Sequence, residues 1–325
     1  MSTKHLLDKE IAPAIEAFPR LNISLETLEA MRADRSMTPE PADAAAAGVR
    51  RKEIHAPGLK AGQPPVRCLA YLPETASQPI GGLLHLHGGG YIWGSPEAAD
   101  PRSVQTAAAL GVAVLSVDYR LAPEQPVPAA LDDSYAALAW FHRNAEELGV
   151  DPSRIAVGGE SAGGGLAAAL AQQACAIGEF PICFQALTYP MLDDRTGGPE
   201  APADPLTGEF IWTRDNNRFG WSSYLGETSP QAPCVPARAA SLAGLPPAWI
   251  STAALDLFRD ENIDYAQRLM RAGVPAELTV YPGACHGFQM ATEAQLTKRY
   301  FRDYLDALSR AVGSAGRSHA SESDG

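Results

Sequence analysis

One serine of the chain stands in a setting that favours nucleophilic chemistry. Ser161 is the centre of the run GESAG at 159–163, which follows the apolar segment 154–159 and opens the alanine-rich segment 161–178. With a strand before it and a helix after it, this G-x-S-x-G pattern predicts a sharp, strained turn that lifts the serine hydroxyl off a sheet. The helix start adds free N–H groups and a favourable dipole. The run therefore predicts a serine nucleophile.

A base and a carboxylate for this serine follow two later segments that read as strands. Segment 248–253 leads to Asp256, and segment 276–281 leads to His286. A serine hydroxyl is a weak nucleophile that needs a base, and the base needs an orienting carboxylate. The order serine, aspartate, histidine is that of the α/β-hydrolases. Asp260 is an alternative acid, but it is expected to cap the next helix, so Asp256 is favoured.

Three consecutive glycines, Gly88, Gly89 and Gly90, follow His87 at the end of another apolar segment. Glycine loses much backbone entropy on folding, so such a run is expected where a tight turn or a close approach excludes side chains. Acyl transfer needs N–H groups aimed at the developing oxyanion. We predict that Gly89, Gly90 and Ala162 supply them, and that His87 braces the loop.

These groups need a scaffold that brings strand ends together. From residue 112 onward, apolar segments that read as strands alternate with helical segments. This alternation predicts an α/β-hydrolase fold whose eight-stranded, mostly parallel sheet is flanked by helices. Ligands bind at the carboxyl ends of such strands. The segments that read as strands are 51–55, 67–72, 81–87, 112–119, 154–159, 182–189, 248–253 and 276–281.

Three stretches fall outside this alternation of strands and helices. Residues 1–48 contain two short amphipathic helices and are predicted to form an N-terminal helical cap segment. The catalytic domain is then 49–312, with 196–240, rich in Gly, Pro and Trp, contributing to the cap. The tail 313–325 is predicted to be disordered because it has little apolar surface to bury.

The motifs together resemble the hormone-sensitive lipase family of bacterial esterases, over about residues 50–310. They are HGGG (87–90), DYRLAPE (118–124), GESAGG (159–164), DLFRDE (256–261) and HGF (286–288). The resemblance implies the α/β-hydrolase fold, hydrolysis of carboxylic esters, a Ser161-Asp256-His286 triad, an oxyanion hole as above, an N-terminal cap and frequent homodimers.

Two positions depart from that family's commonest pattern. Glu160 stands where the family usually has Asp, and Leu257 where Pro usually follows the catalytic Asp. Neither departure touches a triad member. The cholinesterase-like carboxylesterases also carry GESAGG, but they are much longer and cystine-bridged.

Several other side chains belong to the predicted site. Supporting residues around the motifs are His87, Gly88, Gly159, Glu160 and Gly163. The candidates for the substrate pocket are Tyr91, Tyr189, Trp212 and Phe288, for which core packing is the alternative. His85, two residues before His87 on the same strand, is expected to be a core histidine. Cys285 adjoins His286 and could suggest a cysteine nucleophile with a histidine base, but the side chains of sequence neighbours usually point apart.

Charge and composition exclude several classes of partner. The net charge is −12 with an isoelectric point near 5.0, and no basic cluster points to nucleic acid. Five scattered cysteines without a C-x-x-C pair predict neither a disulfide framework nor a zinc site, and no cofactor is implied. The first residues mix charges among apolar positions, so no signal peptide and no membrane span are predicted, and the cytoplasm is the expected location.

The sequence thus predicts a serine carboxylesterase that acts on small to medium-chain acyl esters through an acyl-enzyme. One alternative is a non-catalytic protein that binds a small molecule on the same fold, as the gibberellin receptors do without the catalytic histidine. The presence of His286 favours catalysis. An amidase or lactonase would use the same residues and stays open.

Overall fold

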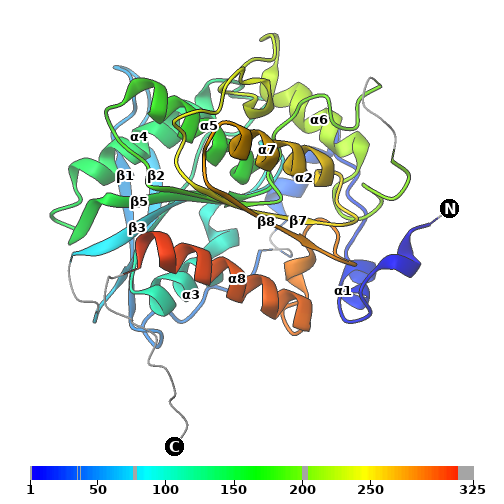
Figure 1. Cartoon of the computed structure of the whole chain (residues 1–325), viewed down its shortest axis with the longest axis horizontal. Helices are drawn as coiled ribbons and strands as arrows, with labels where there is room; N and C mark the ends of the chain where they lie inside the picture. The colour runs from blue at the N-terminus through cyan, green and yellow to red at the C-terminus, as the bar shows by residue number, and fades with distance from the viewer. Residues whose placement is uncertain (1, 35, 37, 76–78, 200–203, 314–325) are drawn as a thin grey trace, which may run out of the picture.

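A single eight-stranded sheet runs through the computed structural model, which describes residues 2–34, 36, 38–75, 79–199 and 204–313 (Figure 1). The strand order is β1-β2-β4-β3-β5-β6-β7-β8. The strands are β1 (Val49–Ala56), β2 (Val66–Pro73), β3 (Ile80–Leu86), β4 (Ala113–Val117), β5 (Val150–Glu160), β6 (Phe184–Thr188), β7 (Ala248–Ala253) and β8 (Ala276–Tyr281).

The sheet is mostly parallel, which confirms the predicted fold class. Only β2 pairs antiparallel with its neighbours β1 and β4, while β4, β3, β5, β6, β7 and β8 pair in parallel. Strands β3, β4 and β7 are buried along their whole length, as their continuous apolar runs predicted. The carboxyl ends of the parallel strands therefore meet along one edge of the sheet.

Helices cover both faces of the sheet. Figure 1 shows α3 and α8 on one face and α4, α5 and α7 on the other. Helix α5, which the alanine-rich segment after Ser161 predicted, places most of its residues in the core. The helices of the catalytic region are α3 (Asp100–Leu110), α4 (Ala129–Arg143), α5 (Ala162–Ile177), α6 (Arg214–Leu225), α7 (Arg259–Arg271) and α8 (Gln295–Val312).

Short helical turns complete the chain, and the N-terminal region contains the two expected helices. The elements are η1 (Lys4–Leu6), α1 (Ala12–Ala17), α2 (Leu25–Ala33), η2 (Pro96–Ala99), η3 (Pro236–Arg238) and η4 (Phe288–Met290). A capping box of Ser24 and Thr27 begins α2. None of the helices in the described part of the chain combines the length and apolarity that crossing a bilayer requires.

The expected N-cap of α7 was wrong. Asp260 does not cap α7, because Phe258 holds the N-cap position and the Asp260 carboxylate pairs with Arg259 at 2.7 Å. Caps depend on side-chain direction, which residue type does not determine.

The two stretches assigned to the cap contact one another. Asn216 of α6 donates from Nδ2 to the carbonyl oxygen of Leu21 at 3.2 Å, and its Oδ1 accepts from the N–H of Ile23 at 3.4 Å. The division into a cap and a catalytic domain remains a prediction. Of the tail predicted to be disordered, residues 314–325 lie outside the described residues.

Candidate active site

Ser161 occupies the turn between β5 and α5, where the sequence pattern placed it. Its backbone has φ +56° and ψ −122°, which is rare for a residue with a side chain. Glycine on both sides makes this turn possible. A Cβ at Gly163 would lie 2.0 Å from the carbonyl oxygen of Leu86, and one at Gly159 would lie 2.3 Å from the same atom. The strained turn therefore sits tightly against the end of β3.

The structure brings His286 and Asp256 to this serine. His286 Nε2 lies 3.0 Å from Ser161 Oγ, and His286 Nδ1 donates to Asp256 Oδ2 at 2.8 Å. Asp256 follows β7 and His286 follows β8, so three strand ends of one sheet supply the three groups. All three residues are buried. The geometry lets Ser161 pass its proton to an imidazole that a carboxylate holds in one tautomer.

Aromatic rings and one amide hold the imidazole and its carboxylate in place. The rings of Tyr189 and Phe258 lie 4.5 and 5.3 Å from the His286 ring, between centroids. Asp256 Oδ1 also accepts from the N–H of Phe258 at 2.9 Å. Asp260, the alternative acid, has a mostly exposed side chain and bonds Arg259 instead.

The glycine loop after β3 presents bare backbone beside the serine. Gly89 has φ +119° and Gly90 has φ +61°. A Cβ at Gly89 would lie 2.1 Å from the carbonyl oxygen of Trp93, and one at Gly90 would lie 2.2 Å from the Trp212 indole. Among the hydrogen bonds of the described residues, the N–H groups of Gly89, Gly90 and Ala162 have no acceptor. That these three N–H groups form an oxyanion hole remains a prediction.

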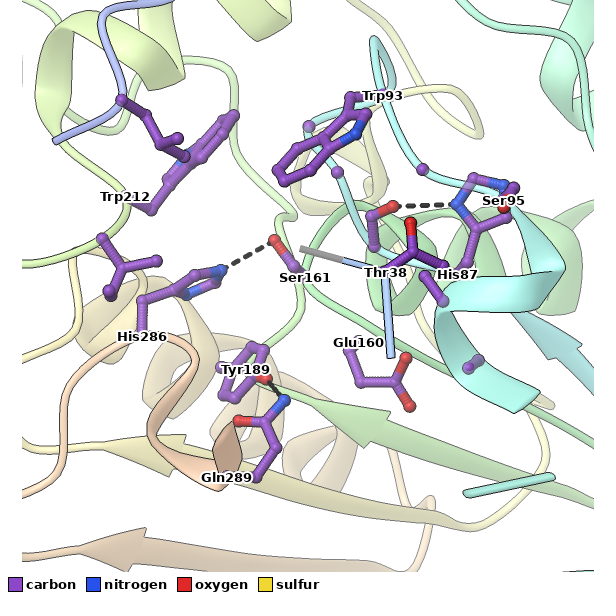
Figure 2. Close-up of a pocket in the computed structure, with 18 of the residues that line it drawn as sticks. Thr38, His87, Trp93, Ser95, Glu160, Ser161, Tyr189, Trp212, His286 and Gln289 are labelled. Atoms are coloured by element: carbon purple, nitrogen blue, oxygen red, sulfur yellow. Dashed lines mark hydrogen bonds between the residues drawn. The ribbon is translucent and has the colours of Figure 1, made fainter. Parts of the chain in front are cut away.

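Ser161 and His286 open into a pocket of about 380 Å³ (Figure 2). Tyr189 and Trp212, two of the four candidates for the substrate pocket, line it. The other two pocket candidates, Tyr91 and Phe288, do not line it. Tyr91 points into the core, where its hydroxyl donates to the carbonyl oxygen of Met191 at 3.0 Å, and Phe288 packs in the core among other aromatic rings.

The chain matches the family described as alpha/beta hydrolase fold over residues 83–290. This chain belongs to that α/β-hydrolase family. The match covers the glycine loop, the serine turn, Asp256 and His286. The resemblance to esterases of the hormone-sensitive lipase family is thereby confirmed, together with the fold it implied.

The chain is similar to several named esterases. Esterase LipI of Mycobacterium tuberculosis is 40% identical over 66% of this chain and 67% of its own. Carboxylesterase NlhH of the same species is 40% identical over 69% and 70%. Among solved structures, a bacterial heroin esterase superposes with a TM-score of 0.87 at 40% identity, covering 96% of this chain and all of that one.

Glu160 is held in a buried cluster that the motif alone did not reveal. Its carboxylate accepts from Arg102 of α3 and lies 3.2 Å from His85 Nε2, and His85 Nδ1 lies 3.1 Å from Ser116 Oγ. Burial alone would raise the pKa of Glu160, but attraction to Arg102 and His85 outweighs it and lowers the pKa to about 2. His85 is the core histidine that was expected.

His87 bonds the glycine loop that follows it. Its Nδ1 donates to the carbonyl oxygen of Gly88 at 2.8 Å, and its ring stacks on Tyr119 at 4.2 Å between centroids. Tyr119 in turn donates to the carbonyl oxygen of His87 at 2.7 Å. Burial lowers the pKa of His87 to about 4, despite the bond to Gly88, so the imidazole is neutral near pH 7.

Cys285 takes no part beside its neighbour His286. Its Sγ lies 3.6 Å from the carbonyl oxygen of His286, whereas the His286 imidazole bonds Ser161 and Asp256. Burial raises the pKa of the Cys285 thiol, so no thiolate forms near neutral pH.

Several residues of the pocket were not found from the sequence. Arg32, Trp93, Arg102 and Gln289 all line it. No motif marks Arg102 or Arg32, since each belongs to an ordinary helix. Gln289 stands one residue beyond the HGF motif, and Trp93 follows the glycine loop, so nearness to a motif was the available signal.

Proposed function

We propose that this chain hydrolyses carboxylic esters with Ser161 as nucleophile. The observation that carries the proposal is the unbroken line from Ser161 Oγ through the His286 ring to Asp256 at the carboxyl ends of the sheet. Ser161 Oγ attacks the ester carbonyl carbon while His286 Nε2 accepts its proton. His286 returns that proton to the leaving alcohol oxygen, which leaves an acyl-enzyme.

Water completes the cycle at the same groups. His286 takes a proton from water, the hydroxyl oxygen bonds to the acyl carbon, and Ser161 leaves with the proton that His286 returns. In both half-reactions the negative charge on the carbonyl oxygen is met by the N–H groups of Gly89, Gly90 and Ala162. Asp256 stabilises the imidazolium but keeps its own charge.

Small to medium-chain acyl esters are the proposed substrates. The pocket of about 380 Å³ is near the lower end of the range of roughly 300–1,000 Å³ typical of small-molecule sites. Leu121, Ile211 and Trp212 contribute apolar lining. A relative from Pseudomonas putida, 36% identical over 69% of this chain and 71% of its own, is named ethyl acetate hydrolase.

Residues 1–48 and 196–240 are proposed to form the cap over this pocket. The pocket is lined by Phe18, Leu21 and Arg32 from the first stretch and by Ile211 and Trp212 from the second. Homodimerisation and a cytoplasmic location, which the sequence led us to expect, are tested by light scattering and by cell fractionation.

The decisive experiment compares wild type and Ser161→Ala on p-nitrophenyl esters from acetate to palmitate. We expect hydrolysis of the shorter esters by the wild type and a loss of about 10⁶-fold in kcat in the variant. An unchanged rate in Ser161→Ala would refute the mechanism. A folded wild type that cleaves no ester would direct attention to anilides and lactones, and then to ligand binding without turnover.

A further inference from the structure

A second cavity of about 940 Å³ adjoins the proposed catalytic pocket between α3, α8 and η4. The two cavities have four lining residues in common: Ala98 and Ala99 of η2, Arg102 of α3 and Gln289 of η4. They therefore meet at these side chains. Figure 1 shows α3 and α8 next to each other on the same face of the sheet.

The side chains at this junction are held by few bonds. Arg102 pairs with Glu160, but its Nε is buried without an acceptor in the described part of the chain. Gln289 donates from Nε2 to the hydroxyl of Tyr189, while its buried Oε1 has no partner among the described residues. Gln289 is a long side chain with several rotatable bonds, so it can move aside at the loss of its bond to Tyr189, while Arg102 stays paired with Glu160.

The far part of the second cavity is suited to an apolar chain. Pro101, Met290, Phe301 and Leu305 line it. Met290 is an exposed apolar side chain, 37% accessible, and methionine adapts its shape to irregular ligands. The charged side chains that also line it, Lys298, Arg302 and Asp306, are exposed and stay in contact with water.

The position of His286 indicates which end of an ester would lie there. His286 must reach the leaving oxygen, so the alcohol occupies the side of Ser161 that faces the imidazole. In Figure 2, His286 lies on one side of Ser161, while Glu160 and Ser95 lie on the other. Glu160 binds Arg102, and Ser95 directly precedes η2, so three of the four shared residues belong to the acyl side.

We propose that the second cavity is an acyl-chain site. In this arrangement the ester group and the first methylenes occupy the pocket above Ser161, and the rest of a linear acyl chain passes Ala98 and Arg102 into the space between α3 and α8. The inference rests on the proposed ester hydrolysis and deepens it, because the chain then accepts acyl groups longer than the catalytic pocket alone would hold.

The test blocks the junction and the cavity separately. Ala98 is exposed and lines both spaces, so Ala98→Trp fills the junction, whereas Leu305→Trp fills only the second cavity. Ala176→Trp, on an exposed position of α5, is the matched control. We would measure kcat/KM for p-nitrophenyl acetate, butyrate, octanoate and decanoate, with thermal unfolding of every variant.

We expect Leu305→Trp to hydrolyse acetate within about twofold of wild type, and both blocking variants to lose at least about tenfold on octanoate and decanoate relative to acetate. Each methylene returned to water removes roughly a fourfold factor, so two displaced methylenes suffice. The Ala176→Trp control is expected to leave every ester unchanged.

Three results would overturn this assignment. The first is an unchanged preference for long esters in both blocking variants. The second is a wild type that cleaves acetate but neither octanoate nor decanoate, which refutes the acyl site and leaves the proposed function standing. The third concerns a series of alkyl acetates from ethyl to decyl acetate. If the blocking variants lost activity selectively on the members with long alcohol chains, the cavity would be assigned to the alcohol. If no ester is cleaved at all, the proposed function fails as well.

Discussion

Nδ1 of His286 donates to Oδ2 of Asp256 at 2.8 Å across thirty positions of sequence. The two residues follow β7 and β8, which pair in parallel from Ala248 with Ala276 to Ala253 with Tyr281. This register brings the two loops together at the same edge of the sheet. The bond selects the tautomer of His286 whose Nε2 can accept a proton from Ser161.

That bond predicts different outcomes for two neighbouring aspartates. Asp256→Asn is expected to lower kcat on a short p-nitrophenyl ester by about 10⁴-fold, because the amide favours the wrong imidazole tautomer. Asp260→Asn is the matched control, and we expect its rate to stay near that of wild type because its carboxylate pairs with Arg259. A large loss in Asp260→Asn with a small one in Asp256→Asn would reverse the assignment of the acid.

The glycine loop allows a second comparison. Gly90→Ala introduces a Cβ that meets the Trp212 indole at 2.2 Å, at a backbone φ of +61°. The loop must shift, so we expect a loss of about 10²- to 10³-fold in kcat, as for one missing oxyanion donor. Gly178→Ala, with φ +75° and open space around the new methyl, bears the same kind of strain away from the site. If both variants lost activity equally, backbone strain alone would explain the effect.

Glu160 is expected to matter for stability. Glu160→Gln leaves Arg102, whose side chain is 16% exposed, without its counter-ion, so we expect a loss of about 3–5 kcal/mol in the free energy of unfolding. Urea unfolding at pH 7 measures it. Glu179→Gln removes an exposed pair with Arg143 and should change the free energy by less than about 1 kcal/mol.

The same pair has a defined pH dependence. The pKa of Glu160 is lowered from 4.5 to about 2 in the folded chain, so the carboxylate stabilises the fold fully above pH 4.5 and loses that contribution as the pH falls toward 2. The difference between wild type and Glu160→Gln should therefore be constant from pH 7 to about 5 and shrink below that. A constant difference down to pH 2.5 would contradict the ion pair as its source.

Arg32 connects α2 to the loops beneath it. Its guanidinium donates to the carbonyl oxygens of Ile92 at 2.8 Å and Ala122 at 2.7 Å, and it pairs with Glu124 at 2.7 Å. Arg32→Ala is expected to raise KM roughly tenfold, because charged hydrogen bonds of this kind each stabilise by about 1.5–3 kcal/mol and α2 then loosens over the pocket. Arg20→Ala, on an exposed position of the same stretch, should leave KM unchanged. A fall in kcat with KM unaltered would instead implicate the glycine loop.

Much of the site could be predicted because its chemistry depends on residue types at strand ends. Apolar segments predicted β3, β5, β7 and β8, and in a parallel sheet their carboxyl ends must meet. Ser161, Asp256 and His286 each follow such a run, so their convergence required no knowledge of side-chain packing. The need for glycine beside Ser161 could be predicted as well, because the close backbone contact there leaves no room for a Cβ.

Other features were decided only in three dimensions. Tyr91 and Tyr189 both follow strands, yet Tyr91 turns into the core and Tyr189 lines the pocket. Sequence position places a residue on a loop but does not determine the direction of its side chain. That direction depends on which neighbours leave room and which polar partner is within reach.

The sequence by itself therefore determined the sheet, the serine turn and the three groups that meet there. Local pattern and strand order specify where each strand ends. Tertiary structure alone decided the Arg102–Glu160 pair, the bonds of Arg32 to Ile92 and Ala122, and the cavity between α3 and α8. These features depend on side chains from segments far apart in the chain. Their distances are set by how helices pack on the two faces of the sheet, a property of the assembled core that no single segment encodes.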